Sequence, residues 1–169
     1  MKKRFLLVGS SFLFLIFVLF TPYQHVLSFT YEDTEKMLAY VKLSNNGSFS
    51  IQYTHSIHLS DVVESYSYNE NHIILKELSF EDFAVGMPSN AEGNEIFEVK
   101  DNRYSIKKMN RIFPFIDLRI GQVRANHQLL YKNKSYTLAD TLHAGEWVRI
   151  SMKKLSIWQQ LKGVKLHES

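Results

Sequence analysis

The segment that decides the fold is SFSIQYTHSI, residues Ser48–Ile57. Its odd-numbered positions hold Phe, Ile, Tyr, His and Ile, whereas its even-numbered positions hold only Ser, Gln and Thr. Because successive side chains of a strand point to opposite faces, this alternation predicts a β-strand with one dry and one wet face. His55 is then a polar side chain on an otherwise apolar face.

The same period-two alternation recurs along most of the chain. Asn45-Asn46-Gly47 precedes the first segment and predicts a hairpin back to a strand over Met37–Leu43. Many short strands separated by turn residues predict a mainly β fold, an antiparallel β-sandwich or barrel. The further strands expected are Val62–Tyr68, His72–Phe80, Ile96–Lys100, Arg103–Met109, Phe115–Gly121, His127–Tyr131, Ser135–Leu138 and Glu146–Lys153.

The composition is that of one folded domain, with 169 residues, 45% of them hydrophobic and 14% aromatic. Cysteine is absent, which excludes disulfides, a thiol nucleophile and a lipid-modified cysteine. The net charge is +3, and Lys2, Lys3 and Arg4 alone supply it. The rest of the chain is neutral, so the basic balance gives no reason to expect a nucleic-acid partner.

Residues 1–30 predict an N-terminal transmembrane or signal helix. Phe5–Phe20 reads FLLVGSSFLFLIFVLF, and Asp, Glu, Lys and Arg are absent from all 27 residues between Phe5 and Tyr31. A spanning helix needs about 20 apolar residues. We expect an uncleaved signal anchor that contacts the cytoplasmic membrane through residues 5–29, with the domain facing outside the cell. A cleaved signal peptide is the alternative, with a poor cleavage site at Val26-Leu27-Ser28.

Two further parts follow the anchor: an extracytoplasmic β domain over 31–153 and a basic amphipathic tail over 154–169. In the tail, Leu155, Trp158 and Leu161 lie near helical spacing among several lysines, which predicts a short C-terminal helix. Such a helix rests on an anionic membrane surface, or caps one end of the sheet, or is a loose tail.

His55 and Glu64 are the candidate functional pair. If Ile57 and Val62 close a hairpin over a four-residue loop, His55 and Glu64 stand directly opposite each other on the apolar face. The pairing would account for two polar residues on one dry face. We interpret it first as a structural fastener, then as a ligand site, and last as an acid–base dyad.

Neither a nucleophile nor a metal site accompanies this pair, and no cofactor is expected. Thr54 and Ser56 point to the face opposite His55, so a catalytic triad fails on strand geometry. His55 and His58 also face opposite sides of a continuous strand, which argues against shared metal ligation. Four arginines either clamp an anion or are simply solvated: Arg111, Arg119, Arg124 and Arg149.

Three short segments carry a resemblance to a known family: Tyr53-Thr54-His55-Ser56-Ile57, Val63-Glu64 and Gly86-Met87-Pro88. They resemble the domain-of-unknown-function family numbered 1850, over about Phe49–Gly145. No catalytic role comes with the matched residues. Members are often encoded beside TRAP transporters of the TAXI type, so the resemblance implies a role near solute uptake.

The expected function is therefore a membrane-anchored accessory or binding module for a TRAP-type solute transporter, and not an enzyme. A transporter subunit or a solute receptor would be the partner. Two alternatives stay open: an envelope hydrolase that uses the His55 and Glu64 pair, and a purely structural membrane protein.

Overall fold

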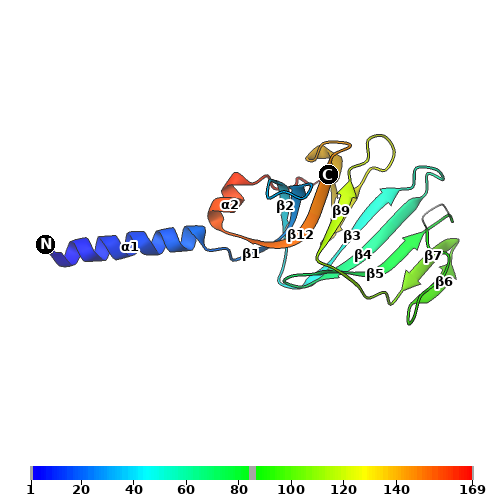
Figure 1. Ribbon diagram of the computed structural model, residues 1–169, viewed down its shortest axis with the longest axis horizontal. Coiled ribbons are helices and arrows are strands. Elements are labelled where there is room, and N and C mark those ends of the chain that lie inside the picture. The colour runs from blue at the N-terminus through cyan, green and yellow to red at the C-terminus, as the bar shows by residue number, and fades with distance from the viewer. Residues whose placement is uncertain (1, 84–86, 169) are drawn as a thin grey trace.

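The computed structural model describes residues 2–83 and 87–168 of the chain. Helix α1, Lys2–Phe20, projects from one end of a β domain that contains all the strands (Figure 1). A short second helix, α2, Ile157–Lys162, lies beside the end of α1, and a 3-10 turn, η1, spans Leu138–Asp140. Within the described residues, no helix combines the length and apolarity that crossing a membrane requires.

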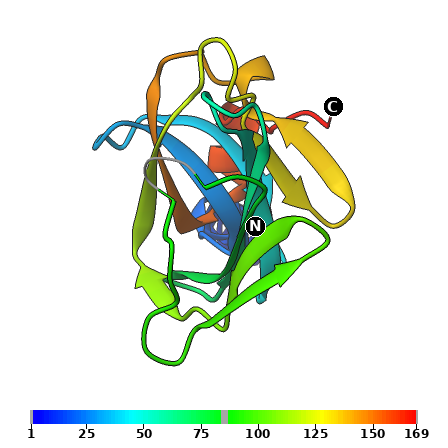
Figure 2. The same cartoon turned by 90° about the vertical axis from the view of Figure 1, so that its right-hand side faces the viewer.

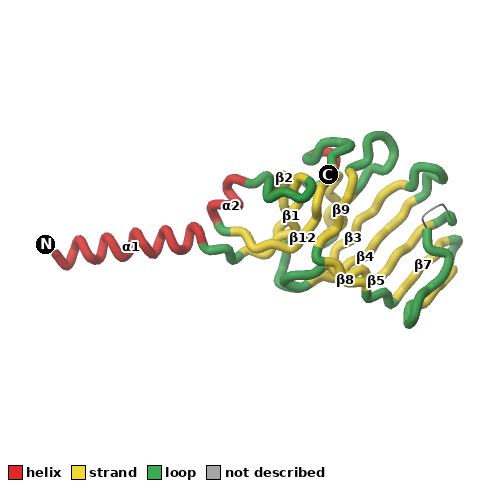
Figure 3. The backbone as a smooth tube through the Cα atoms, in the orientation of Figure 1, coloured by secondary structure: helices red, strands yellow, loops and turns green. Residues whose placement is uncertain are grey.

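The strands form two antiparallel sheets, traced in yellow in Figure 3. The smaller sheet has four strands, in the order β2 (Met37–Lys42), β1 (Gln24–Tyr31), β12 (Trp147–Leu155) and β9 (Phe115–Arg119).

The larger sheet has eight strands. Seven follow one another in the order β11 (Lys134–Thr137), β10 (Gln128–Tyr131), β3 (Gly47–Thr54), β4 (Asp61–Tyr68), β5 (Ile73–Phe80), β7 (Arg103–Lys107) and β6 (Ile96–Lys100). The eighth, β8 (Arg111–Phe113), pairs with the first half of β5.

Buried residues of both sheets form one hydrophobic core, and Figure 2 views the domain end-on, along the long axis of Figure 1. Phe29 and Ile150 from the smaller sheet and Ile51 and Phe80 from the larger one are among its fully buried members. The predicted mainly β, antiparallel architecture is confirmed, and so is a short C-terminal helix. The buried residues of the two sheets belong to one shared core.

Strand β1 occupies residues that were expected to continue the membrane segment. The helix ends at Phe20, and Gln24–Tyr31 forms a central strand of the smaller sheet instead. Val26, Leu27 and Phe29 are fully buried, because the core covers one face of β1 and Tyr40 and Leu155 pack around Val26 on the other. No charged residue separates β1 from α1, so the sequence of β1 reads as an extension of the helix before it.

The hairpin expected at Asn45-Asn46-Gly47 is also wrong, because β2 and β3 belong to different sheets and the chain crosses between the sheets there. Gly47 is needed for another reason. A Cβ atom at this position would lie 2.7 Å from the Tyr68 hydroxyl oxygen, so the close approach of the Tyr68 ring requires glycine.

The C-terminal region departs from the sequence pattern in its boundaries. Strand β12 continues to Leu155, and α2 begins only after Ser156. Ser156 and Gln159 form a capping box: the Gln159 amide donates to Ser156 Oγ at 3.2 Å, and the Ser156 amide donates to Gln159 Oε1 at 2.9 Å. This cap fixes the short helix directly against the end of β12.

Candidate functional site

The expected opposition of His55 and Glu64 is wrong. In the β3–β4 ladder Glu64 faces Ile51, and Thr54 is paired with Asp61. His55 follows the end of β3 and lies in the connecting loop, residues 55–60. The loop therefore has six residues, and not the four on which the predicted register depended.

Bonds at the mouth of the hairpin explain the longer loop. Asp61 accepts hydrogen bonds from Gln52 Nε2 at 3.0 Å and from Thr54 Oγ1 at 3.4 Å, which holds Thr54 beside Asp61. The His55 amide donates to the Ser60 carbonyl at 2.8 Å, and Leu59 takes a positive φ of 57° to close the turn. A leucine in the left-handed region gave no turn signal in the sequence.

Glu64 nevertheless lies on the inner face of the larger sheet, as its parity predicts. It is half-buried, with Ile51 and Leu78 as its cross-strand neighbours. The Tyr66 hydroxyl donates to Glu64 Oε2 at 2.6 Å. Burial raises the pKa of the Glu64 carboxyl, and the hydrogen bond from Tyr66 opposes this rise. Glu64 is thus bonded to Tyr66, and not to His55, which was its predicted partner.

Tyr53 and His127 complete this site, and we call Tyr53, Glu64, Tyr66 and His127 together the inner site. Burial and the Glu64 charge raise the pKa of Tyr53 to about 12. Burial is also the main reason why the pKa of Tyr66 is raised. The His127 ring lies 5.4 Å from the Tyr53 ring, centre to centre. Its Nδ1 accepts a hydrogen bond from the Gly121 amide at 3.1 Å, and burial lowers its pKa.

This arrangement keeps the two phenols and the His127 imidazole neutral. The two phenols stay protonated at physiological pH, and His127 is held neutral with Nδ1 as an acceptor. Activating a nucleophile would require a base beside it, and the Glu64 carboxylate is engaged by Tyr66. The geometry is that of a structural or ligand-binding site. Side chains two positions apart in a strand point to the same face. This spacing is the sequence signal that could have indicated the contact between Tyr66 and Glu64.

The remaining residues of the sequence motif do not belong to the inner face of the larger sheet as far as the structure describes them. Ser56 is exposed in the 55–60 loop, Pro88 is half-buried, and Gly86 lies outside the described residues. The amide of Thr54, the last residue of β3, donates to the Ala125 carbonyl at 2.8 Å, which brings the base of the 55–60 loop next to the loop over residues 121–126.

These two loops expose three aliphatic side chains, which we call the apolar rim: Ile57, Leu59 and Val123. Their exposed fractions are 65%, 58% and 90%. Apolar side chains clustered on neighbouring loops are typical of a surface that contacts another molecule.

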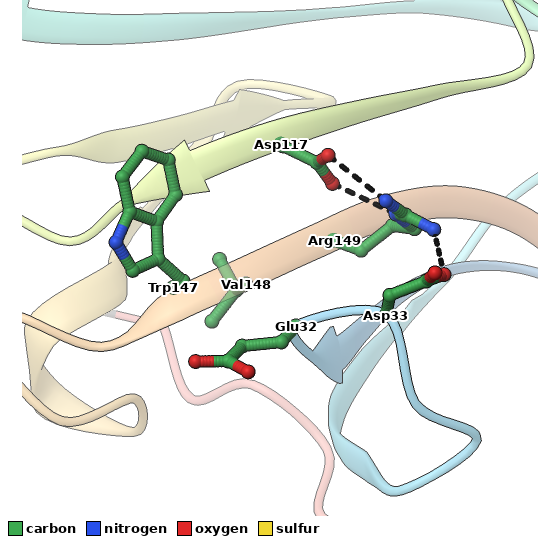
Figure 4. A pocket seen from close by; sticks show the side chains of 6 residues that line it. All are labelled: Glu32, Asp33, Asp117, Trp147, Val148 and Arg149. Carbon is green, nitrogen blue, oxygen red and sulfur yellow. Dashed lines mark hydrogen bonds and ion pairs between the residues drawn. The ribbon is translucent and has the colours of Figure 1, made fainter.

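A hollow of about 300 Å³ lies on the outer face of the smaller sheet (Figure 4). Arg149 is held there by Asp117 through two hydrogen bonds, Nε to Oδ1 at 2.8 Å and Nη2 to Oδ2 at 2.9 Å, and by an ion pair with Asp33. Its guanidinium carbon also lies 3.7 Å from the centre of the Phe115 ring.

Arg149, one of the four arginines expected either to clamp an anion or to be solvated, is thus occupied by carboxylates of this chain. Arg111 is similarly paired with Glu95 and Glu92. Among the residues that the structure describes, His, Asp and Glu side chains do not gather in groups of three or more that could hold a metal ion.

Fold and site together define a mainly β domain of two antiparallel sheets, preceded by an apolar helix, with a tyrosine–glutamate contact on the inner face of the larger sheet. The family model of the domain of unknown function DUF1850 matches residues 49–138, which is more than half of the chain. The chain belongs to this family. Comparison with curated proteins and with solved structures found no match. The matched range contains the inner site and the apolar rim.

Proposed function

We propose that this protein is a membrane-attached binding module. Helix α1 attaches it to the cytoplasmic membrane, and the β-sandwich docks a partner protein outside the cell. The TRAP-type solute transporter that the family resemblance implies is the expected partner, either a transporter subunit or its solute receptor.

The observation that carries this proposal is the exposure of apolar side chains on α1. A helix with apolar side chains all round needs a lipid or protein environment, because water solvates such a surface poorly. Six large side chains of α1 each expose more than half of their surface: Phe12, Leu13, Phe14, Leu15, Phe17 and Phe20. Lipid contact along α1 would cover them.

The apolar rim supports the docking part of the proposal. It lies in the family-matched range, on loops held by the strands of the larger sheet, and loops on a rigid scaffold commonly carry binding residues. The envelope hydrolase requires His55 beside Glu64, and the β3–β4 register separates these two residues.

Affinity capture from solubilised membranes, with the intact chain as bait, tests the proposal. We expect the chain to fractionate with membranes and to capture a subunit of a solute transporter. The double variant Ile57→Ser with Leu59→Ser should lose this capture at least several-fold. Ile112→Ser is the matched control, because Ile112 is 58% exposed on β8, at the other end of β5 from the rim.

Capture of no transport protein, under conditions that keep known membrane complexes whole, would contradict the docking part of the proposal. Equal capture by the double variant and the intact chain would exclude the apolar rim as the docking surface. A chain that fractionates with soluble proteins would contradict the membrane attachment.

A further inference from the structure

The junction between α1 and α2 has features that neither the fold nor the docking surface explains. The Phe20 ring at the end of α1 packs against the Trp158 ring of α2, with 5.7 Å between ring centres. The capping box at Ser156 fixes α2, so Trp158 is held at the place where α1 leaves the domain. Trp158 and Leu161 remain exposed, by 40% and 74%.

Beside this pair of rings lies a hollow of about 370 Å³, which we call the α2 hollow. Three lysines line it, Lys153, Lys154 and Lys162, against one carboxylate, Glu35. Lys162 Nζ lies 4.7 Å from the centre of the Trp158 ring. A fourth lysine, Lys42, is near it on the same sheet face, because Lys42 and Lys153 flank Val26 from the two neighbouring strands.

The carboxylates that face these lysines are held loosely. Lys153 pairs with Glu35 at 2.8 Å and Lys154 with Glu70 at 3.2 Å, but the two carboxylate side chains are 95% and 61% exposed. Ion pairs this exposed contribute little and exchange readily for another anion. The α2 hollow therefore carries an excess of positive charge directly beside the apolar helix.

We propose that the α2 hollow binds the phosphate headgroup of an anionic phospholipid. The inference rests on the proposed function, because α1 must lie in lipid for the hollow to reach the membrane surface. Tryptophan and lysine side chains next to an apolar helix are the groups that prefer the headgroup region. Lysines at an anionic membrane surface strengthen attachment by about five-fold each. The continuity of the hollow with α1 favours a membrane lipid over a free phosphate.

Fluorescence of Trp158 tests this directly, because the chain has only two tryptophans. The full chain carrying Trp147→Phe is reconstituted in vesicles of phosphatidylcholine, alone or mixed with phosphatidylglycerol, with a nitroxide quencher on a minority of headgroups. We expect quenching of Trp158 to rise with the phosphatidylglycerol fraction. Lys153→Gln and Lys162→Gln should each raise the fraction needed for half of this effect several-fold.

The matched control is Lys76→Gln, an exposed lysine of β5 that bonds Asn110 and lies outside the α2 hollow. It should behave as the chain without a lysine substitution. Equal quenching in both vesicle types, or unchanged titrations of the two hollow variants, would overturn the headgroup site while membrane attachment stands. A chain that fails to join either vesicle would instead overturn the proposed attachment through α1.

Discussion

Tyr66 donates a hydrogen bond of 2.6 Å to the Glu64 carboxylate, from two residues further along the same face of β4. The contact places a carboxyl group and a phenol on the inner surface of the larger sheet, between the cross-strand neighbours Ile51 and Leu78. Because the pKa of Glu64 is raised by burial, the folded domain binds a proton there more readily than the unfolded chain does.

The first prediction concerns Glu64→Gln and pH. The contribution of Glu64 to stability is complete below its ordinary pKa of 4.5 and is lost as pH rises through the raised value of the folded state. Glutamine stays neutral and still accepts the Tyr66 bond. We expect Glu64→Gln to stabilise the domain at pH 8, by the order of 1 kcal/mol, and to have little effect at pH 4. Urea unfolding at the two pH values measures this.

Glu98→Gln is the control of opposite sign. A hydrogen bond and the charge of Lys107 lower the pKa of Glu98, so this carboxylate contributes stability above its ordinary pKa and loses it as pH falls. Glu98→Gln should therefore lower stability at pH 8. If Glu64→Gln also weakened the fold at pH 8, the burial assigned to Glu64 would be wrong.

A second prediction separates the observed partner of Glu64 from the expected one. A double-mutant cycle of Tyr66→Phe with Glu64→Leu should give a coupling of about 1–3 kcal/mol, because Tyr66→Phe leaves a half-buried carboxylate without its donor and leucine needs none. The cycle of His55→Ala with Glu64→Leu should give none beyond about 0.5 kcal/mol. A larger coupling in the histidine cycle would restore the register that the structure replaces.

The face on which Glu64 lies was predicted correctly from the sequence, but its partner was not. The parity of Val62–Tyr68 placed Glu64 on the correct face, since alternation alone fixes which side each residue takes. The partner was predicted wrongly because the true register pairs Glu64 with Ile51, four positions before His55. A register shift by an even number of residues leaves each side chain on the same face, so the alternation could not reveal it. The loop length depends on the bonds that Asp61 accepts, which no local pattern reveals.

The bounds of some strands and the neighbours of others could not be predicted from the sequence pattern either. Strand β1 was assigned to the membrane segment because no charged residue separates it from α1, although Leu27, Ser28, Phe29 and Thr30 alternate between apolar and polar. The three residues of β8 are too few to show any period. Arg149 was a candidate from the sequence, but its contact with Asp117 requires β12 and β9 to be neighbours, which depends on the sheet topology.

A third prediction tests the close approach at Gly47. Gly47→Ala should destabilise the domain by about 1–3 kcal/mol, because the new methyl group meets the Tyr68 hydroxyl oxygen. In a Tyr68→Phe background that oxygen is gone, so the same substitution should cost less. Thermal unfolding of the four proteins gives the comparison. Equal costs in both backgrounds would exclude the Tyr68 hydroxyl as the obstacle.

The fourth prediction concerns the Arg149 and Asp117 pair. The hydrogen bond from Arg149 lowers the pKa of Asp117, so its contribution is present above the ordinary pKa of 3.8 and fades as pH falls. Asp117 is 45% exposed, so we expect Asp117→Asn to cost less than about 1 kcal/mol at neutral pH. The cost should shrink further in high salt. A cost that is independent of salt would indicate a packing role in place of a charge role.

Spin labelling tests the membrane attachment through α1 most directly, and the absence of native cysteines makes each label unique. One full-length chain carries a nitroxide at Phe14→Cys in α1, and another carries it at Ile112→Cys, on exposed β8. In phospholipid vesicles, the label at position 14 should collide with dissolved oxygen and be shielded from a water-soluble nickel complex, whereas the label at position 112 should show the reverse. Equal access of the nickel complex to both labels would contradict the attachment of this protein to the membrane through α1.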